Sequence, residues 1–164
     1  MKNVRIYSAK QDKVVVVDKI EKSNAEWEKL LTKTQYEITT KKGTETPGTC
    51  LFNQVHEPGL FRCVRCETDL FRSSTKFDSG TGWPSFTKPL EPGNIAEKED
   101  RSFFMKRIEV RSKHGGSHLG HVFNDGPPPT GLRYCMNSAA LRFIPKEDLE
   151  KDGYGEYSKL FAKK

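Results

Sequence analysis

Turn-forming residues divide the middle of this chain into short pieces, and this feature constrains its fold more than any other. Most of the 13 glycines and nine prolines lie between residues 43 and 131. Glycine and proline interrupt helices and mark turns, so a long helix does not fit this region. The pieces between the turns have the length of short strands, which favours antiparallel pairing over a βαβ wrap. We expect strands at residues 60–63, 70–71, 102–111, 121–123, 132–137 and 139–144.

Both ends of the chain have a different character. Residues 1–20 are expected to form an extended arm with a short strand at 14–17. Ser23 and Glu26 have the spacing of a capping box, which predicts a helix near 24–32. Thr32 and Gln35 predict a second short helix that ends before Gly43. The charged residues 145–164 have room for one short helix.

Size and charge exclude several classes of protein. The 164 residues suffice for one ordinary domain. The longest apolar run, residues 14–17, is far shorter than the ~18 residues of a membrane span. The net charge of +6 is not concentrated in a block, so it is a weak argument for nucleic-acid binding. We expect neither a membrane nor a nucleic acid as partner, and a cytoplasmic location because an apolar leader is lacking.

The four cysteines indicate redox or metal chemistry. They are Cys50, Cys63, Cys66 and Cys135. In a reducing compartment such residues tend to be metal ligands or redox catalysts. Cys63 and Cys66 have the spacing of half a zinc site, but a second such pair is missing. A pair of structural thiols is the alternative interpretation.

Two segments, residues 77–86 and 117–138, stand apart from the pattern of strands and loops. The second holds Cys135 together with His118 and His121. An imidazole or a cation beside a thiol lowers its pKa from about 8.5, and the thiolate is the nucleophile. Each of these residues alone would also fit a structural role, the cysteine as a small core residue and the histidines as buried side chains with their hydrogen bonds formed.

Taken together, the segments resemble a known family, the B-type methionine-R-sulfoxide reductases. The motifs KFDSGTGWPSF and HLGHVFNDGPPPTGLRYCMNSAAL carry the resemblance, which begins at TKTQYEITTKKGTE and covers residues 34–143. An N-terminal arm with a short helix (1–33) and a charged C-terminal tail (144–164) lie outside it. The resemblance implies a mainly β single domain, with two antiparallel sheets arranged like a tent and short N-terminal helices.

The resemblance also implies a role for each matching residue. Cys135 stands at the position of the catalytic nucleophile, and Trp83 at that of the indole that holds the substrate's S-methyl group. Asp125 and Arg133 match residues that tune the surroundings of the cysteine. The residues that surround the sulfoxide oxygen and a water are His118, His121 and Asn137.

The residue types suit this chemistry. A sulfoxide sulfur is attacked by a thiolate while its oxygen is protonated, and a histidine can donate that proton near neutral pH. Cys135 then becomes a sulfenic acid and methionine leaves. A second thiol condenses with the sulfenic acid to a disulfide, which thioredoxin reduces. The expected partners are oxidised proteins bearing methionine-R-sulfoxide and thioredoxin, and the expected oligomeric state is a monomer.

The sequence departs from the family's pattern at the zinc site. Many members hold zinc with two CxxC pairs, and here the second pair is replaced by Ser112 and Gly115. We therefore expect no cofactor, and zinc is not carried over. Cys63 and Cys66 remain weak candidate ligands, with His114 a speculative substitute.

The resolving cysteine also departs from the pattern. Many members carry it in the GWPSF motif, at the position of Thr81 here. Some members use a cysteine after the GTE segment instead, which corresponds to Cys50. Cys50 lies in a turn-rich segment, and closing a long loop costs an entropy that grows slowly with length. Cys63 and Cys66 are the competing resolvers, and direct reduction without a resolver is a third route.

Two other functions stay open at this point. One is a small β domain that binds metal and recognises an acidic partner. The other is a redox sensor that uses the same Cys135 sulfenic acid without turnover. An assay that supplies thioredoxin and both sulfoxide epimers discriminates between them and the enzyme.

Overall fold

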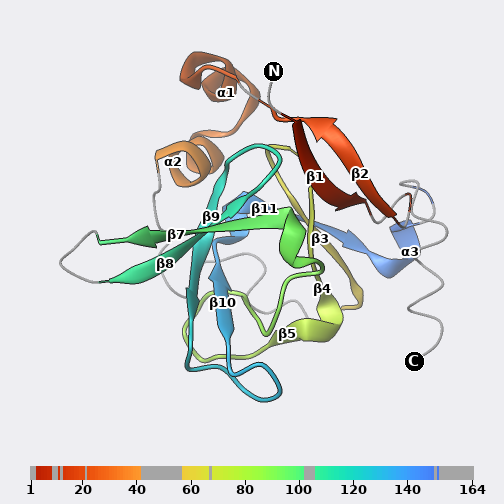
Figure 1. Cartoon of the computed structure of the whole chain (residues 1–164), viewed down its shortest axis with the longest axis vertical. Helices are drawn as coiled ribbons and strands as arrows, with labels where there is room; N and C mark the ends of the chain where they lie inside the picture. The colour runs from red at the N-terminus through yellow and green to blue at the C-terminus, as the bar shows by residue number, and fades with distance from the viewer. Residues whose placement is uncertain are drawn as a thin grey trace.

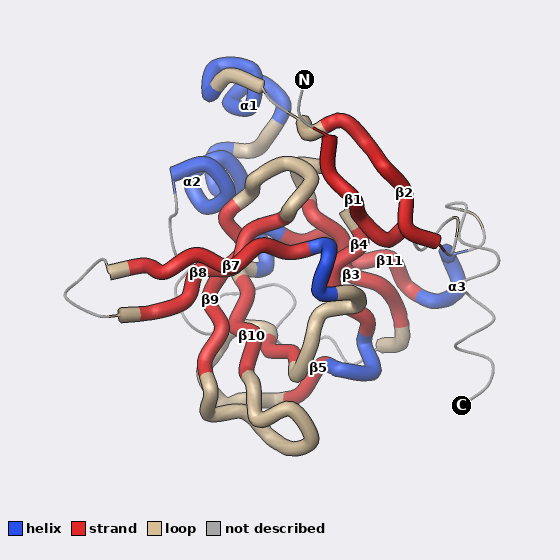
Figure 2. The backbone as a smooth tube through the Cα atoms, in the orientation of Figure 1, coloured by secondary structure: helices blue, strands red, loops and turns tan. Residues whose placement is uncertain are grey.

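The computed structural model describes residues 3–8, 11, 13–20, 22–41, 57–66, 68–101, 106–149 and 151. Strands dominate this part of the chain, which forms one domain (Figure 2). The strands make antiparallel sheets of six, three and two strands. The prediction of a mainly β domain with two antiparallel sheets and short N-terminal helices is confirmed, and the two-stranded sheet is an addition to it.

The six-stranded sheet holds most of the segments singled out in the sequence. Its strands, in spatial order, are β5 (Lys76–Phe77), β6 (Ser85–Phe86), β10 (Arg133–Met136), β9 (His118–Phe123), β8 (Arg107–Ser112) and β7 (Ile95–Asp100). The β7–β8 hairpin extends away from the body of the domain (Figure 1). The three-stranded sheet has the order β11 (Leu141–Pro145), β3 (Gly59–Cys63) and β4 (Asp69–Arg72).

Strand β7 was not expected from the sequence. Its residues IAEKED are mostly charged, and only Ile95 is buried, because β7 is an edge strand of its sheet. The other expected strands are present with ends shifted by a few residues. The expected strand at 102–111 begins at Arg107, and its residues 102–105 lie outside the described residues.

Aromatic side chains fill the core between the two larger sheets. Phe71 of β4 stacks on Phe86 of β6 with ring centroids 4.3 Å apart, and Phe61 of β3 meets Phe86 edge-on at 5.1 Å. All three rings are fully buried. Burial of a phenyl ring of this size stabilises a fold by roughly 1.5–3 kcal/mol. This cluster therefore fixes β6, and with it the neighbouring strand β10, against the smaller sheet.

The N-terminal arm is a hairpin rather than a single extended segment. Strand β1 (Asn3–Ser8) pairs with β2 (Lys13–Asp18) along its whole length. The buried Asn94 side chain anchors the hairpin, since its amide accepts from the Tyr7 backbone N–H at 2.6 Å and donates to the Tyr7 carbonyl at 2.9 Å. The prediction of one short strand at residues 14–17 found β2 but missed β1. Strand β1 is specified by its pairing with β2 and not by an apolar pattern of its own.

Both predicted N-terminal helices are present, as α1 (Asn24–Leu30) and α2 (Lys33–Lys41). Ser23 and Glu26 form the capping box, with the Glu26 N–H donating to Ser23 Oγ at 3.2 Å. Thr32 and Gln35 form a second one, with bonds of 3.0 and 3.2 Å. The C-terminal segment carries a short helix, α3 (Lys146–Leu149). Within the described ranges, the helices are all too short and too polar to cross a membrane.

Candidate active site

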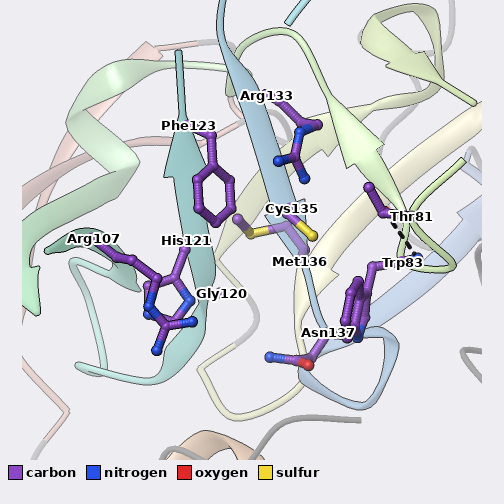
Figure 3. Close-up of a pocket in the computed structure, with 10 residues that line it drawn as sticks. All are labelled: Thr81, Trp83, Arg107, Gly120, His121, Phe123, Arg133, Cys135, Met136 and Asn137. Carbon is purple, nitrogen blue, oxygen red and sulfur yellow. Dashed lines mark hydrogen bonds between the residues drawn. The ribbon is translucent and has the colours of Figure 1, made fainter. Parts of the chain in front are cut away.

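A cavity of about 220 Å³ opens where β8, β9 and β10 meet the loop between β5 and β6 (Figure 3). Its lining combines a thiol, an imidazole, two guanidinium groups and an aromatic wall. The lining residues are Thr81, Trp83, Arg107, Gly120, His121, Phe123, Arg133, Cys135, Met136 and Asn137. The cavity thus brings together five of the residues predicted from the sequence: Trp83, His121, Arg133, Cys135 and Asn137.

The position of Cys135 follows from the strand register. On one side it pairs with Ser85 of β6, and on the other with His121 of β9. A central strand held on both sides is a rigid support for a reacting atom. Gly120 is required beside it, because a Cβ at Gly120 would collide with the Cys135 carbonyl oxygen and lie 2.9 Å from the Met136 Cα. The absence of a side chain at Gly120 therefore lets β9 approach β10 at the cysteine.

The Cys135 thiol is partly buried, and burial raises its pKa above the ordinary value. The Arg133 guanidinium and a hydrogen bond from Thr81 oppose this shift but do not cancel it. The sequence argument predicted a thiol whose pKa is lowered by its neighbours. The structure has the cationic neighbour, but desolvation outweighs it, so Cys135 is a protonated thiol at neutral pH in the resting protein.

Asp125 holds Arg133 beside the cysteine. The carboxylate accepts two bonds from the guanidinium, at 2.9 and 3.0 Å, and this bidentate pairing fixes the plane of the group. The guanidinium also lies over the Phe123 ring, 4.4 Å from its centroid. Asp125 itself is exposed and lies outside the lining of the cavity.

Trp83 lies in a loop shaped by glycines. Gly80 and Gly82 have φ angles of 76° and 91°, in a backbone region that residues other than glycine rarely adopt. The Trp83 backbone N–H donates to Thr81 Oγ1 at 3.3 Å. The indole stands across the cavity from His121 and beside Asn137 (Figure 3). This placement supplies an apolar wall opposite the imidazole.

His118 and His121 lie on the same side of β9 because of a bulge. Residues three apart in a regular strand point to opposite faces. Here Val110 pairs with Gly120 and Arg111 with His118, so Leu119 is the extra residue on β9. The two imidazole rings meet edge-on with centroids 5.5 Å apart. His121 lines the cavity, whereas His118 is buried behind it.

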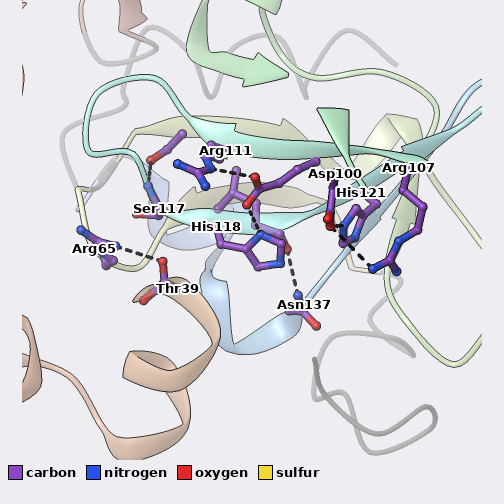
Figure 4. A network of polar contacts seen from close by, with 12 residues as sticks. Thr39, Arg65, Asp100, Arg107, Arg111, Ser117, His118, His121 and Asn137 are labelled. Carbon is purple, nitrogen blue, oxygen red and sulfur yellow. Dashed lines mark hydrogen bonds and ion pairs between the residues drawn. The ribbon is translucent and has the colours of Figure 1, made fainter. Parts of the chain in front are cut away.

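Each histidine contacts a carboxylate that the sequence analysis did not single out (Figure 4). His118 Nδ1 lies 2.6 Å from Glu109 Oε2, and His121 Nε2 lies 2.9 Å from Asp100 Oδ2. Burial raises the pKa of Glu109, but the bonds to His118 and Arg111 outweigh this effect and leave the pKa below its usual value. Glu109 reaches His118 from the neighbouring strand β8, and Asp100 reaches His121 from β7, one strand further along the sheet, so only the strand order could have identified them.

Asn137 follows β10 and also lines the cavity. Its backbone N–H and its side-chain amide both donate to the Leu119 carbonyl oxygen, at 2.9 and 3.2 Å. The amide is thereby held in one orientation. Arg107, Phe123 and Thr81 complete the lining, and the sequence analysis assigned none of them to the site.

Cys63 and Cys66 lie in a separate buried corner. The Cys63 thiol contacts Ser117 Oγ at 3.2 Å, and the Cys66 sulfur contacts Thr68 Oγ1 at 2.9 Å and Ser112 Oγ at 3.4 Å. Hydrogen bonding from Cys63 and from these hydroxyls lowers the pKa of Cys66 to about 5, while burial raises that of Cys63.

The same corner lacks a complete set of metal ligands. Ser112 and Gly115, at the positions of the family's second ligand pair, both lie beside Cys66. His114 Nε2 donates to the Asp18 carbonyl oxygen at 3.0 Å. Among the described residues there is no group of three or more histidine, cysteine or acidic side chains that could hold a metal. Cys63, Cys66 and Cys135 are free thiols, and Cys50 lies outside the described residues.

Comparison with known proteins matches residues 31–145 to the SelR domain. Three similar proteins bear related names. A peptide methionine sulfoxide reductase MsrB of Herminiimonas arsenicoxydans is 49% identical over 83% of this chain and 99% of its own length. An MsrB of Methanosarcina mazei is 50% identical over 82% of this chain and 96% of its own length. The MsrA/MsrB protein of Vibrio cholerae is 54% identical over 80% of this chain, but the match spans only 35% of that longer protein.

Proposed function

Because the chain belongs to the SelR-domain family of B-type methionine sulfoxide reductases, we propose that it reduces methionine-R-sulfoxide to methionine through a sulfenic acid on Cys135. One observation carries the proposal: a single cavity is lined by the Cys135 thiol, the His121 imidazole, the Asn137 amide and the Trp83 indole. These are the nucleophile, the proton donor, the oxygen ligand and the methyl-binding wall that the reaction requires.

The substrate is placed by its three different substituents. The S-methyl group packs on Trp83, the oxygen points toward His121 and Asn137, and the sulfur faces Cys135. A pyramidal sulfur held at three points in this way fits in one configuration. The R epimer is therefore the substrate, and the S epimer would direct its oxygen or its methyl group to the wrong wall.

The chemical step transfers one oxygen atom and two electrons. The Cys135 sulfur attacks the sulfoxide sulfur and forms a sulfur–sulfur bond, while His121 protonates the oxygen and the sulfur–oxygen bond breaks to release water. Water then attacks the Cys135 sulfur, the sulfur–sulfur bond breaks with its electron pair leaving on methionine, and Cys135 carries the oxygen as a sulfenic acid. Since the resting thiol is protonated, its proton has to leave the sulfur during the step, and Arg133 stabilises the negative charge that forms there.

Recycling uses a second thiol, for which we propose Cys50. The thiol condenses with the sulfenic acid, a disulfide forms and water leaves. The structure supports this choice indirectly, because Cys63 is fully buried on β3 of the smaller sheet and Cys66 is only 7% exposed. Either would have to leave a hydrogen-bonded corner to reach Cys135. Thioredoxin then reduces the disulfide by thiol exchange.

The remaining properties follow from this chemistry. The substrates are oxidised proteins, the reductant is thioredoxin, and neither a cofactor nor a metal takes part. Three free thiols within the described part of the chain suit a reducing compartment, and we place the protein in the cytoplasm. We propose that it acts as a monomer, since a single chain already supplies the thiol, the imidazole, the amide and the indole of the site.

Steady-state turnover with thioredoxin and an R-sulfoxide peptide tests the proposal. Cys135→Ser should abolish turnover while the melting temperature stays unchanged, because serine has nearly the same shape and is a far weaker nucleophile. Cys50→Ala should release one equivalent of methionine and then stop. A Cys135–Cys63 or Cys135–Cys66 disulfide, found by peptide mapping of the oxidised enzyme, would contradict the role of Cys50. Turnover by Cys135→Ser would contradict the whole mechanism.

A further inference from the structure

Two carboxylates stand behind the histidines of the site, and each contacts a different ring nitrogen. Glu109 Oε2 lies 2.6 Å from Nδ1 of His118, and Asp100 Oδ2 lies 2.9 Å from Nε2 of His121. An ionised carboxylate can only accept a hydrogen bond, so in each pair the imidazole nitrogen carries the hydrogen. The bonds therefore hold His118 with its hydrogen on Nδ1 and His121 with its hydrogen on Nε2.

Burial makes both contacts effective. Glu109 is fully buried and His118 is 3% exposed, while Asp100 and His121 are 11% and 12% exposed. Attraction between charges that are this close and this shielded from water is screened far less than at a surface. A carboxylate within about 4 Å of an imidazole favours its protonated form and raises the pH at which it loses a proton.

An arginine accompanies each carboxylate and acts in the opposite direction. Arg111 Nε lies 2.9 Å from Glu109 Oε1, and an Arg107 guanidinium nitrogen lies 3.6 Å from Asp100 Oδ2. These cations share the negative charge and disfavour a nearby imidazolium. Helix α2 also packs against β9, and of its buried residues only Tyr36 titrates. Among the described residues, the charged or titratable groups that contact the two rings or their carboxylates, or line the cavity with His121, include Asp100, Arg107, Glu109, Arg111, Arg133 and Cys135.

We propose that Glu109 and Asp100 are positioning residues, which hold His118 and His121 in opposite tautomers and fix the orientation of both rings. This inference rests on the proposed function, because it assigns the positioning of the proton donor of the same site. His121, which faces the cavity, is the donor to the sulfoxide oxygen, and Asp100 orients its ring. His118 stays behind it as a fixed ring that Glu109 orients.

Nitrogen NMR of histidine-labelled protein tests the assignment without reference to activity. In the full-length wild type, the neutral forms should carry the hydrogen on Nδ1 of His118 and on Nε2 of His121. Asp100→Asn and Glu109→Gln should each let the neutral ring beside the change populate the other tautomer, because an amide side chain can donate as well as accept a hydrogen bond. Each change should leave the tautomer of the other histidine as it is in the wild type.

Arg111→Met provides the matched control, because Arg111 is outside the cavity lining. It should leave His118 with its hydrogen on Nδ1, because Glu109 keeps its charge, whereas general loosening of the site would change the tautomer in both variants. Asp100→Asn, whose partners His121 and Arg107 are both partly exposed, keeps the test informative if Glu109→Gln fails to fold. Unchanged histidine tautomers in folded Asp100→Asn and Glu109→Gln proteins would overturn the inference.

Kinetics then separate this inference from the proposed function. Asp100→Asn should lower kcat/KM for an R-sulfoxide peptide by more than Arg111→Met does, because the donor ring is then no longer held in one tautomer. A wild type without reductase activity would refute the proposed function and leave the NMR result standing. An active wild type whose kcat/KM is unchanged by Asp100→Asn would refute the role of Asp100.

Discussion

Gly120 offers a quantitative test of how the strand register builds the site. A Cβ at this position would lie 2.9 Å from the Met136 Cα, 3.0 Å from the Cys135 carbonyl carbon and closer still to the Cys135 carbonyl oxygen. All three atoms belong to the backbone of β10, so a side-chain rotation cannot relieve the contact. Ordinary contacts between carbon atoms are about 3.5–4.0 Å, and Gly120→Ala therefore has to displace β10 by about 1 Å.

This displacement has two measurable consequences. Overpacking of this kind costs about 1–3 kcal/mol, and at about 2 kcal/mol a chain of this length should lose about 4–8 °C in Tm. A shift of about 1 Å at a reacting atom costs on the order of 10²-fold in rate. We therefore expect Gly120→Ala to fold, to melt several degrees lower, and to lose about 10²-fold in kcat/KM on an R-sulfoxide peptide well below its Tm.

Gly93→Ala is the control, because a Cβ at Gly93 meets nothing within 4 Å and its φ lies outside the left-handed region. Gly93→Ala should have the same Tm and kcat/KM as the wild type within experimental error. The two variants are compared by thermal unfolding and by thioredoxin-supported turnover. A Gly120→Ala protein with the Tm and kcat/KM of the wild type would refute the claim that the close approach of β9 to β10 positions Cys135.

Two further predictions concern the thiols. Arg133→Met should raise the pKa of Cys135 further, because the guanidinium lowers it. Each unit by which this pKa rises should slow alkylation of Cys135 by iodoacetamide at neutral pH by about tenfold. Arg5→Met on the N-terminal hairpin is the control, and equal alkylation rates in the wild type and both variants would contradict the role of Arg133. Treatment with a chelator should leave Tm and activity unchanged, because Cys63 and Cys66 meet the Ser112 hydroxyl and Gly115 instead of two further thiols; a fall in Tm that zinc restores would show a bound metal.

Local sequence signals predicted the elements that depend on neighbouring residues. The capping boxes at Ser23 and Thr32 located α1 and α2, and each forms its predicted hydrogen bonds. Strands β1, β5, β6 and β7 escaped prediction because each depends on a partner strand. The six residues of β7 are largely exposed and charged, so their sequence has no apolar alternation to detect.

The residues of the site likewise divide into those with a local sequence signal and those placed by strand pairing. The motifs located Cys135, His121, Asn137 and Trp83, which the fold brings to one cavity. Asp100 and Glu109 carry no motif, and their contacts with the histidines arise from the pairing of β7, β8 and β9 and from the bulge at Leu119. The rise in the pKa of Cys135 could not be predicted from the sequence either, because it depends on how deeply the thiol is buried. The pairing of Cys50 with Cys135 remains a prediction.

The central claim is tested most directly by a single turnover without reductant, using peptides that carry pure R or pure S methionine sulfoxide. We predict that the wild type releases one equivalent of methionine from the R peptide and almost none from the S peptide. With Cys50→Ala, dimedone should trap the sulfenic acid on Cys135, and Cys135→Ser should release no methionine. Comparable release from both epimers, or methionine release by Cys135→Ser, would contradict the account.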